Sequence, residues 1–208
     1  MYLKVFPSGP IDTNAILVAC PKKKVAIIID PAFGSAPHFL ERAKKEGFSF
    51  QGIYLTHSHW DHIGDLKMLK EKLHLPVFVH KDDAEYVEHP PKRFCPLEIE
   101  GVVPDHYLKD GEIISVGDLT FKVIHTPGHS LGSVCFYFEK EKVLISGDTL
   151  FKGTIGRVDL PTSDPTLMWR SLKKLSELPH DTQVFPGHGD ETTIGAEQWI
   201  KNAKERFI

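Results

Sequence analysis

The sequence predicts an α/β fold with antiparallel sheets. Two pairs of apolar segments, residues 15–19 with 25–29 and residues 134–139 with 142–146, are separated by short charged turns, which is typical of antiparallel hairpins. Further strands cluster before and between stretches of helical periodicity. This mixture favours antiparallel sheets combined with helices over a doubly wound parallel sheet.

The N-terminal half begins with a strand at residues 1–6, which ends at a turn marked by Pro7 and Pro10. The basic run at residues 22–24 connects two apolar strands, and we interpret it as a solvated hairpin turn rather than a binding patch. The apolar run at residues 53–55 predicts a buried strand. Helices are expected at residues 36–46, 64–73, 81–88, 165–178 and 195–206.

Residues 89–105 contain four prolines and show little periodicity. The segment is too long for a simple connector. We favour a lid over the functional site, with an ordered surface loop as the alternative. Cys95 in this segment is an alternative nucleophile, but no motif places a histidine or an acidic partner beside it.

Composition limits the classes of function. The 208 residues suffice for one domain with a sizeable core. The net charge of −3, with signs mixed along the chain, gives no electrostatic footprint for nucleic acid or a membrane surface. No apolar stretch approaches the length of a membrane span, and nothing resembles a signal peptide. Three cysteines without paired spacing favour a reducing cytoplasm. We therefore expect a cytoplasmic protein with no nucleic-acid, membrane or obligate protein partner.

The loop from His57 to His62 places four metal-ligand side chains within one turn of backbone. His57, His59, Asp61 and His62 supply imidazole and carboxylate without cysteine, which suits zinc, iron or manganese rather than a closed thiolate site. A strand precedes these residues and a helix follows them. Because all four would crowd one ion, we expect two neighbouring metals to share them.

The rest of the chain repeats one pattern, in which an apolar strand is followed by glycine and at once by His or Asp. The strands at residues 119–124, 142–146 and 183–186 run into Gly128-His129, Gly147-Asp148 and Gly187-His188. Glycine lets the backbone turn sharply, so the next side chain can point across the sheet edge. The strand ends can then converge on one pocket and position ligands more accurately than free loops do.

We assign metal ligands in three sets: His57, His59 and His129 to a first metal, Asp61, His62 and His188 to a second, and Asp148 as the bridge. Two metals about 3.5–4 Å apart can hold a bridging hydroxide and clamp the attacked oxygen and the leaving group of a hydrolysis. The other histidines are interpreted as surface or core residues, although His125 can alternatively hydrogen-bond a ligand. A chance polar loop is the alternative for the cluster, and the accompanying strand ends argue against it.

These motifs resemble the metallo-β-lactamase superfamily. The resemblance rests on the His-x-His-x-Asp-His loop and on residues 127–129, 146–149 and 186–189. Residues 150–161 are similar to the loop after the bridging aspartate in short, single-domain glyoxalase II-like (hydroxyacylglutathione hydrolase-like) hydrolases. The resemblance implies a four-layer αββα sandwich of two mainly antiparallel sheets flanked by helices, with the metals at one edge of the sheets.

The resemblance also implies a dinuclear metal-dependent hydrolase that cleaves a small-molecule thioester, such as S-lactoylglutathione or a related hydroxyacyl thioester. Two divalent metals would be bound, with zinc favoured over iron or manganese. Asp61 would ligate the second metal and orient, or accept the proton of, the nucleophile, a metal-bridged hydroxide. Full-length glyoxalase II enzymes bind glutathione through a C-terminal helical extension, whereas this sequence predicts one domain over residues 1–208 without it.

Arg157 follows Asp148 in the chain and is a candidate contact for a substrate carboxylate. The alternative is a surface ion pair with Asp159 or Asp164. Glyoxalase II enzymes tend to place lysine and aromatic residues near the thiol carrier, whereas the comparable stretches here hold Arg157, Asp159 and Asp190. We therefore expect thioester cleavage with weak binding of glutathione.

Functions of other classes remain alternatives. A persulfide dioxygenase-like enzyme of this fold uses one iron, here held by His57, His129 and Asp148, and one iron per chain would favour it over the hydrolase. A lactonase or other ester hydrolase of the same fold is a second alternative. A non-catalytic binding module would have lost a ligand, and here all seven positions are filled.

Overall fold

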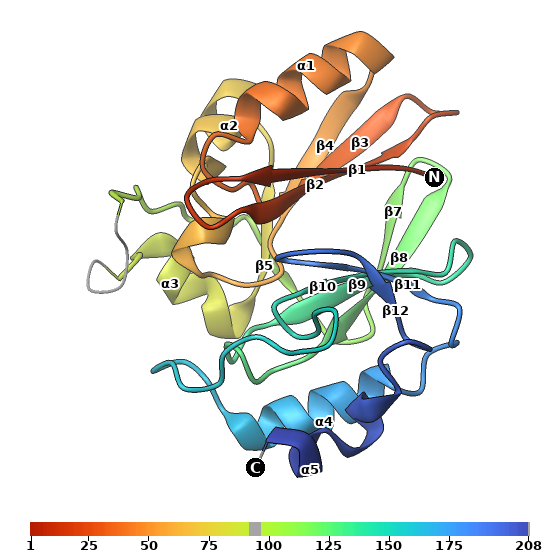
Figure 1. Ribbon diagram of the computed structural model, residues 1–208. Coiled ribbons are helices and arrows are strands. Elements are labelled where there is room, and N and C mark those ends of the chain that lie inside the picture. The colour runs from red at the N-terminus through yellow and green to blue at the C-terminus, as the bar shows by residue number, and fades with distance from the viewer. Residues whose placement is uncertain (92–96, 208) are drawn as a thin grey trace.

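The computed structural model describes residues 1–91 and 97–207, which form two six-stranded sheets packed face to face (Figure 1). The first sheet has the order β1 (Tyr2–Ser8), β2 (Thr13–Cys20), β3 (Val25–Ile29), β4 (Ser49–Tyr54), β5 (Val77–His80) and β6 (His106–Leu108). The second has the order β12 (Thr192–Thr193), β11 (Gln183–Pro186), β10 (Val143–Gly147), β9 (Val134–Phe138), β8 (Leu119–His125) and β7 (Ile113–Val116).

Strand direction differs between the two sheets. The predicted hairpins β2–β3 and β9–β10 are confirmed, and the second sheet is antiparallel except where β10 pairs with β11. In the first sheet, β3 to β6 run parallel, which is more parallel pairing than the sequence predicts. Parallel neighbours need crossover connections. These crossovers contain α1 (Ala36–Glu46), α2 (Leu66–Leu73) and α3 (Ala84–Glu88).

Helices flank both sheets, as the expected four-layer sandwich requires. The helices α1 and α2 lie on the outer side of the first sheet, and α4 (Pro165–Leu175) with α5 (Ala203–Phe207) lies on the outer side of the second (Figure 1). Three apolar layers result, one between the sheets and one under each helical layer. Residues 15–19 of β2 are all apolar because both faces of the strand are buried. Leu17 faces the helices, whereas Ile16 and Val18 face the second sheet.

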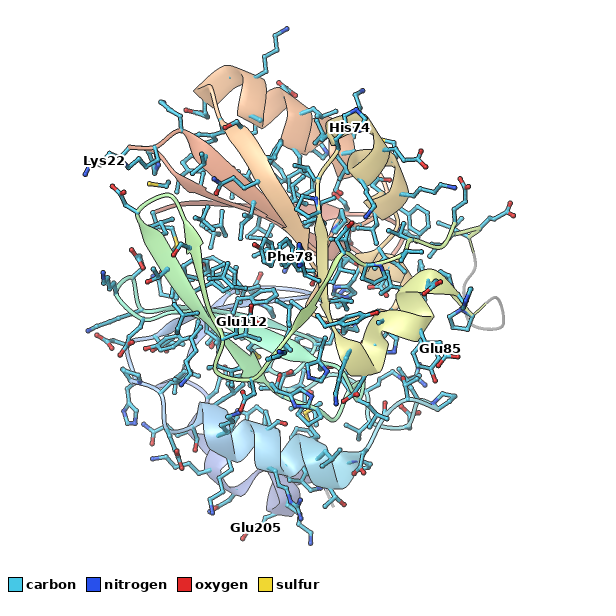
Figure 2. All side chains as sticks on the ribbon, turned by 180° about the vertical axis from the view of Figure 1, so that it is seen from behind. Lys22, His74, Phe78, Glu85, Glu112 and Glu205 are labelled. Carbon is cyan, nitrogen blue, oxygen red and sulfur yellow. The ribbon has the colours of Figure 1, made fainter. Side chains whose placement is uncertain are left out.

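Aromatic side chains between the sheets fix the end of β4. Tyr54 stacks on Phe78 with ring centroids 4.3 Å apart and meets Phe121 of the second sheet edge to face at 5.5 Å. Figure 2 shows Phe78 in the interior between the sheets. Tyr54 is the last residue of β4, so this packing sets the point from which the His57 loop leaves the sheet.

Predicted helices differ from the observed ones mainly at their ends. The prediction at residues 36–46 matches α1, and the prediction at 165–178 overruns α4, which ends at Leu175 before Ser176. The predicted helix at 81–88 divides into the 3-10 turn η2 (Lys81–Asp83) and α3, and the one at 195–206 divides into η4 (Gln198–Asn202) and α5. Lys22 lies at the exposed tip of the β2–β3 hairpin, as expected of a solvated turn (Figure 2).

The proline-rich segment is held against α2 where the structure describes it. The Lys70 ammonium donates to the Val103 carbonyl at 3.2 Å, and Ile99 packs on the apolar layer under the helices. Residues 92–96, Cys95 included, lie outside the described residues, and the lid interpretation of residues 89–105 stays a prediction. In the described part of the chain, no helix is both long and apolar enough to cross a membrane.

Candidate metal centre

The loop after β4 carries four of the predicted ligands. Backbone pairing continues beyond the strand, because Leu55 N donates to Phe78 O at 2.9 Å and Val134 N donates to Thr56 O at 2.8 Å. The chain then turns into the 3-10 helix η1 (Trp60–His62), which reverses its direction ahead of α2. The predicted strand-to-helix loop is therefore confirmed, with a short 3-10 turn inserted in it.

The structure brings His57, His59 and His129 together, and we call them the first group. One potential ligand atom from each lies within 4.8 Å of the others, and His59 Nδ1 is 2.7 Å from His129 Nε2. Burial, followed by the neighbouring imidazoles, holds the pKa of His57 well below its ordinary value and lowers the pKa of His59 to about 3. Both rings are neutral near pH 7, which is the state of imidazole that binds metals.

Asp61, His62 and His188 form a second group beside the first. Asp61 Oδ2 lies 3.2 Å from His62 Nε2 and 3.1 Å from His188 Nε2. Burial alone would lower the pKa of His62, but the carboxylates of Asp61, Asp148 and Asp30 outweigh it and raise the pKa well above its ordinary value. The surrounding negative charge favours a positive charge at this position, and a bound cation can provide it.

Asp148 lies between the two groups. Its Oδ2 is 3.3 Å from His129 Nε2 of the first group, and its Oδ1 is 3.4 Å from His62 Nε2 of the second. Gly187 allows the next loop to come this close, because a Cβ there would lie 2.1 Å from Asp148 Oδ1. This is the glycine-before-ligand arrangement predicted from the sequence.

Three buried atoms test whether these residues fit metal ions. Among the described residues, five buried side-chain atoms lack a hydrogen-bond partner, and three of the five are His57 Nε2, His62 Nε2 and Asp148 Oδ1. Such atoms are rare in proteins and cost free energy unless something binds them. All three belong to the predicted ligand set, and imidazole with carboxylate suits zinc, iron or manganese. The residues therefore fit divalent metals.

Hydrogen bonds from Nδ1 orient three of the candidate histidines. His62 Nδ1 donates to Asp30 Oδ2 at 2.9 Å, and His129 Nδ1 donates to the Arg157 carbonyl at 2.8 Å. His188 Nδ1 donates to a backbone carbonyl at 3.2 Å. A proton on Nδ1 leaves Nε2 free as an electron-pair donor, which is the usual role of such outer contacts in metal sites.

Sequence reasoning missed several of these supporting residues. Asp30 accepts hydrogen bonds from Thr56 N at 2.7 Å and Thr56 Oγ1 at 2.6 Å, besides the one from His62. Thr13 Oγ1 donates to Asp61 Oδ2 at 2.7 Å. Asp30 follows an apolar strand directly, as Asp148 nearly does, so the strand-end pattern contained the signal. Thr13 carries no comparable signal, because a polar residue at the start of a strand is common.

Arg157 contacts this site through its main chain. Its guanidinium forms a paired hydrogen bond with Asp159 at 2.9 and 3.0 Å, and both side chains are exposed. This is the surface ion pair considered as the alternative, and Asp164 instead caps α4. A contact between the Arg157 guanidinium and a substrate carboxylate stays a prediction.

In the described part of the chain, no hydrogen bond joins the His125 ring to a predicted metal ligand. Its Nε2 donates to the Leu131 carbonyl at 2.9 Å, and its ring stacks on His80 with centroids 4.1 Å apart and 14° between the planes. With Asp82 these two histidines make another potential ligand group. Nearly parallel rings keep their lone pairs in separate planes, so they do not converge on one ion as the first group does.

The profile of the metallo-beta-lactamase superfamily matches residues 8–188. An uncharacterized protein of Aquifex aeolicus is 44% identical over 211 residues, covering 95% of this chain and 94% of the relative. A hydroxyacylglutathione hydrolase, GloC, of Haemophilus influenzae is 32% identical, covering 95% of each. The matching region includes all seven predicted metal ligands.

Solved structures give the same answer for the fold. The crystal structure of the B3 metallo-beta-lactamase BLEG-1 is 40% identical with a TM-score of 0.87, covering 94% of this chain and 96% of that one. The crystal structure of TTHA1623 in a di-iron-bound form is 36% identical with a TM-score of 0.84, covering 93% of this chain and 96% of that one.

Proposed function

The chain belongs to the metallo-β-lactamase superfamily, and we propose that within it this protein is a dinuclear metal-dependent hydrolase of a small thioester. One observation carries the proposal: a single buried carboxylate, Asp148, lies within 3.4 Å of a histidine from each of two ligand groups. The first group would hold one metal and the second group the other, with Asp148 between them. Two divalent ions, with zinc favoured over iron or manganese, would supply hydroxide near neutral pH and would polarise the attacked carbonyl when bound there.

Asp61 has the properties of an orienting group. The bond from Thr13 fixes its carboxylate, and although burial opposes ionisation, His62 and His188 hold its pKa below the ordinary range. It is therefore an anion at neutral pH and a weak base. We assign it the role of accepting a hydrogen bond from the nucleophile, which the sequence left open beside that of accepting its proton.

The thioester assignment rests on chemistry and on one relative. A thiolate is a stable leaving group, so the reaction does not require a strong general acid from the chain. The relative GloC is a hydroxyacylglutathione hydrolase and matches along nearly its whole length. Hydrolysis of a related hydroxyacyl thioester, S-lactoylglutathione included, is the specific reaction proposed for this chain.

Weak binding of glutathione follows from the charges near the site. Arg157 pairs with Asp159, and Lys152 Nζ pairs with Asp190 at 3.0 Å, all on exposed side chains. Each cation must leave an acidic partner before it can bind a carboxylate of the thiol carrier. We therefore propose a high KM, which reflects lost ground-state binding more than lost stabilisation of the transition state.

A thiol-release assay with S-lactoylglutathione, beside a lactone and a β-lactam, tests the proposal. We expect thioester turnover in zinc-, iron- or manganese-loaded protein and a linear rise of rate with substrate up to high concentration. The β-lactam is included because BLEG-1, a B3 metallo-beta-lactamase, is 40% identical. Cleavage of the β-lactam or lactone without thioester turnover in any metal form would refute the thioester proposal.

The oxidative alternative uses a different metal count. One iron held by His57, His129 and Asp148 would leave the second group without a function, although its ligand atoms converge as closely as those of the first. This second group favours the hydrolase. Metal quantification on the protein used in the assay separates the two, since the oxygenase requires one iron per chain.

A further inference from the structure

The buried carboxylate of Asp83 joins two loops of the metal centre. Its Oδ2 accepts hydrogen bonds from Ser58 N and Ser130 Oγ, both at 2.8 Å, and its Oδ1 accepts one from Gly132 N at 2.7 Å. Only 1% of the Asp83 surface is exposed. Charge-assisted hydrogen bonds of this length in a buried site are strong, so the carboxylate fixes both loops relative to each other.

Both loops carry histidines of the first group. Ser58 stands between His57 and His59, and Ser130 follows His129 directly. Among the described residues, no hydrogen bond joins Asp83 to these three rings; Asp83 reaches them through the neighbouring backbone and hydroxyl. Its effect on the first group is therefore one of position.

Asp83 occupies a helix N-cap position, but its side chain does not cap the helix. It is the N-cap residue of α3, where an aspartate side chain usually accepts a hydrogen bond from the first helical turn. Here the side chain makes no capping bond and turns toward the loops instead. The fit is close, because a Cβ on Gly132 would lie 2.5 Å from Asp83 Oδ1.

The second group has a different support. Asp30 accepts a hydrogen bond from His62 Nδ1, and Thr13 donates one to Asp61. Asp30 also accepts both hydrogen bonds from Thr56, whose Oγ1 lies 3.0 Å from His57 Nδ1, so Asp30 supports the first group as well. None of these bonds involves Asp83. We propose that Asp83 is a positioning residue for the first metal alone: it sets the distance between the His57 loop and the His129 loop and thereby the affinity of that ion. This inference rests on the proposed dinuclear centre.

The variant Asp83→Asn keeps the size of the side chain and replaces one of its two acceptor oxygens with an NH2 group. A carboxamide has one acceptor oxygen, whereas Ser58 N and Gly132 N both require one, so one N–H faces an NH2 group. Asp82→Asn is the matched control, because it makes the same change of charge one residue earlier on an exposed side chain. Ser130→Ala removes one of the three donors and is the milder test.

Zinc affinity is measured by competition with a chromophoric chelator in two backgrounds. His188→Ala keeps the first group intact, and His129→Ala keeps the second. We expect Asp83→Asn to weaken zinc binding by about 10- to 100-fold in the His188→Ala background, the usual cost of losing an outer contact of a metal site. In the His129→Ala background the affinity should not change. Asp82→Asn should have no effect in either.

Ser130→Ala should show the same selectivity for the first group with a smaller loss, and it carries the comparison if Asp83→Asn does not fold. Equal weakening in both backgrounds would reveal general destabilisation and overturn the inference, as would an unchanged affinity of the first group. A wild-type protein that binds no zinc, iron or manganese would instead overturn the proposed function. The cobalt-loaded proteins give a second readout, because a shift of the visible spectrum reports changed ligand geometry.

Discussion

At the scale of single residues, burial and the neighbouring candidate ligands decide the charge of each histidine. His57 is buried and His59 is half-buried among other imidazoles, and desolvation followed by these neighbours lowers the pKa of both rings. His62 is as deeply buried, yet its pKa rises, because it faces three carboxylates. The pKa values of histidines on the same loop are thus shifted in opposite directions. Asp148 contacts one histidine of the first group and one of the second.

We predict that Asp148→Ala removes more metal than His62→Ala. The aspartate contacts histidines of both groups and supplies negative charge between two cations, whereas His62 belongs to the second group only. After dialysis, His62→Ala should retain close to one ion per chain and Asp148→Ala clearly less than one. Metal quantification checks this, with Asp190→Ala, which removes an exposed carboxylate, as the control that retains two. Wild-type metal content in Asp148→Ala would disprove the bridging role.

At the scale of elements, the ends of strands and helices brace the loops of the site. The N-cap residue of α4 and the residue before it support the His129 loop, since Asp164 N donates to Gly128 O at 2.8 Å and Ser163 Oγ donates to His129 O at 2.7 Å. Across the sheets, Asn14 Nδ2 at the start of β2 donates to backbone carbonyls on both sides of His188. The ligand loops are therefore held at both ends by regular structure.

We predict that Asp164→Ala lowers stability by about 1 kcal/mol, because it removes the N-cap of α4. Asp164 Oδ1 accepts from Thr166 N at 2.7 Å and from Leu167 N at 3.1 Å. For a chain of this size the loss corresponds to a fall of roughly 2–4 °C in Tm. Asp164→Ser, which can still cap, should stay near the wild type in the same thermal scan. Identical Tm values for the alanine and serine variants would show that the cap contributes nothing.

At the scale of the molecule, the two hairpins and the candidate ligands could be predicted because each depends on local sequence, whereas the sandwich of two sheets was implied by the family resemblance. The hairpins follow from apolar runs around charged turns, and the strand-end glycines identify Asp148 and His188. The parallel part of the first sheet was not predictable in this way, since β5 and β6 are short and their pairing depends on the crossover helices. Asp83 was equally hidden, because its partners Ser58 and Ser130 are distant in sequence and become neighbours only in the fold.

The assembled ligand set joins the two sheets. Residues 57–62 follow β4 of the first sheet, whereas His129, Asp148 and His188 follow β8, β10 and β11 of the second. Each proposed metal would therefore be held by ligands from both sheets. An ion that binds only when the sheets are packed together stabilises the folded state by mass action.

We predict that zinc raises the Tm and that a chelator reverses the rise. At a free zinc concentration 100 times Kd, one site adds about 2.7 kcal/mol, which corresponds to a rise of roughly 5–11 °C for a chain of this size. A variant with His129→Ala and His188→Ala lacks one ligand of each group and should lose most of this rise, while its metal-free Tm stays close to that of the metal-free wild type. Thermal scans with zinc and with chelator measure both effects. An equal rise in Tm in the double variant would show that zinc binds at surface side chains outside the two groups. It would contradict a metal centre that joins the sheets.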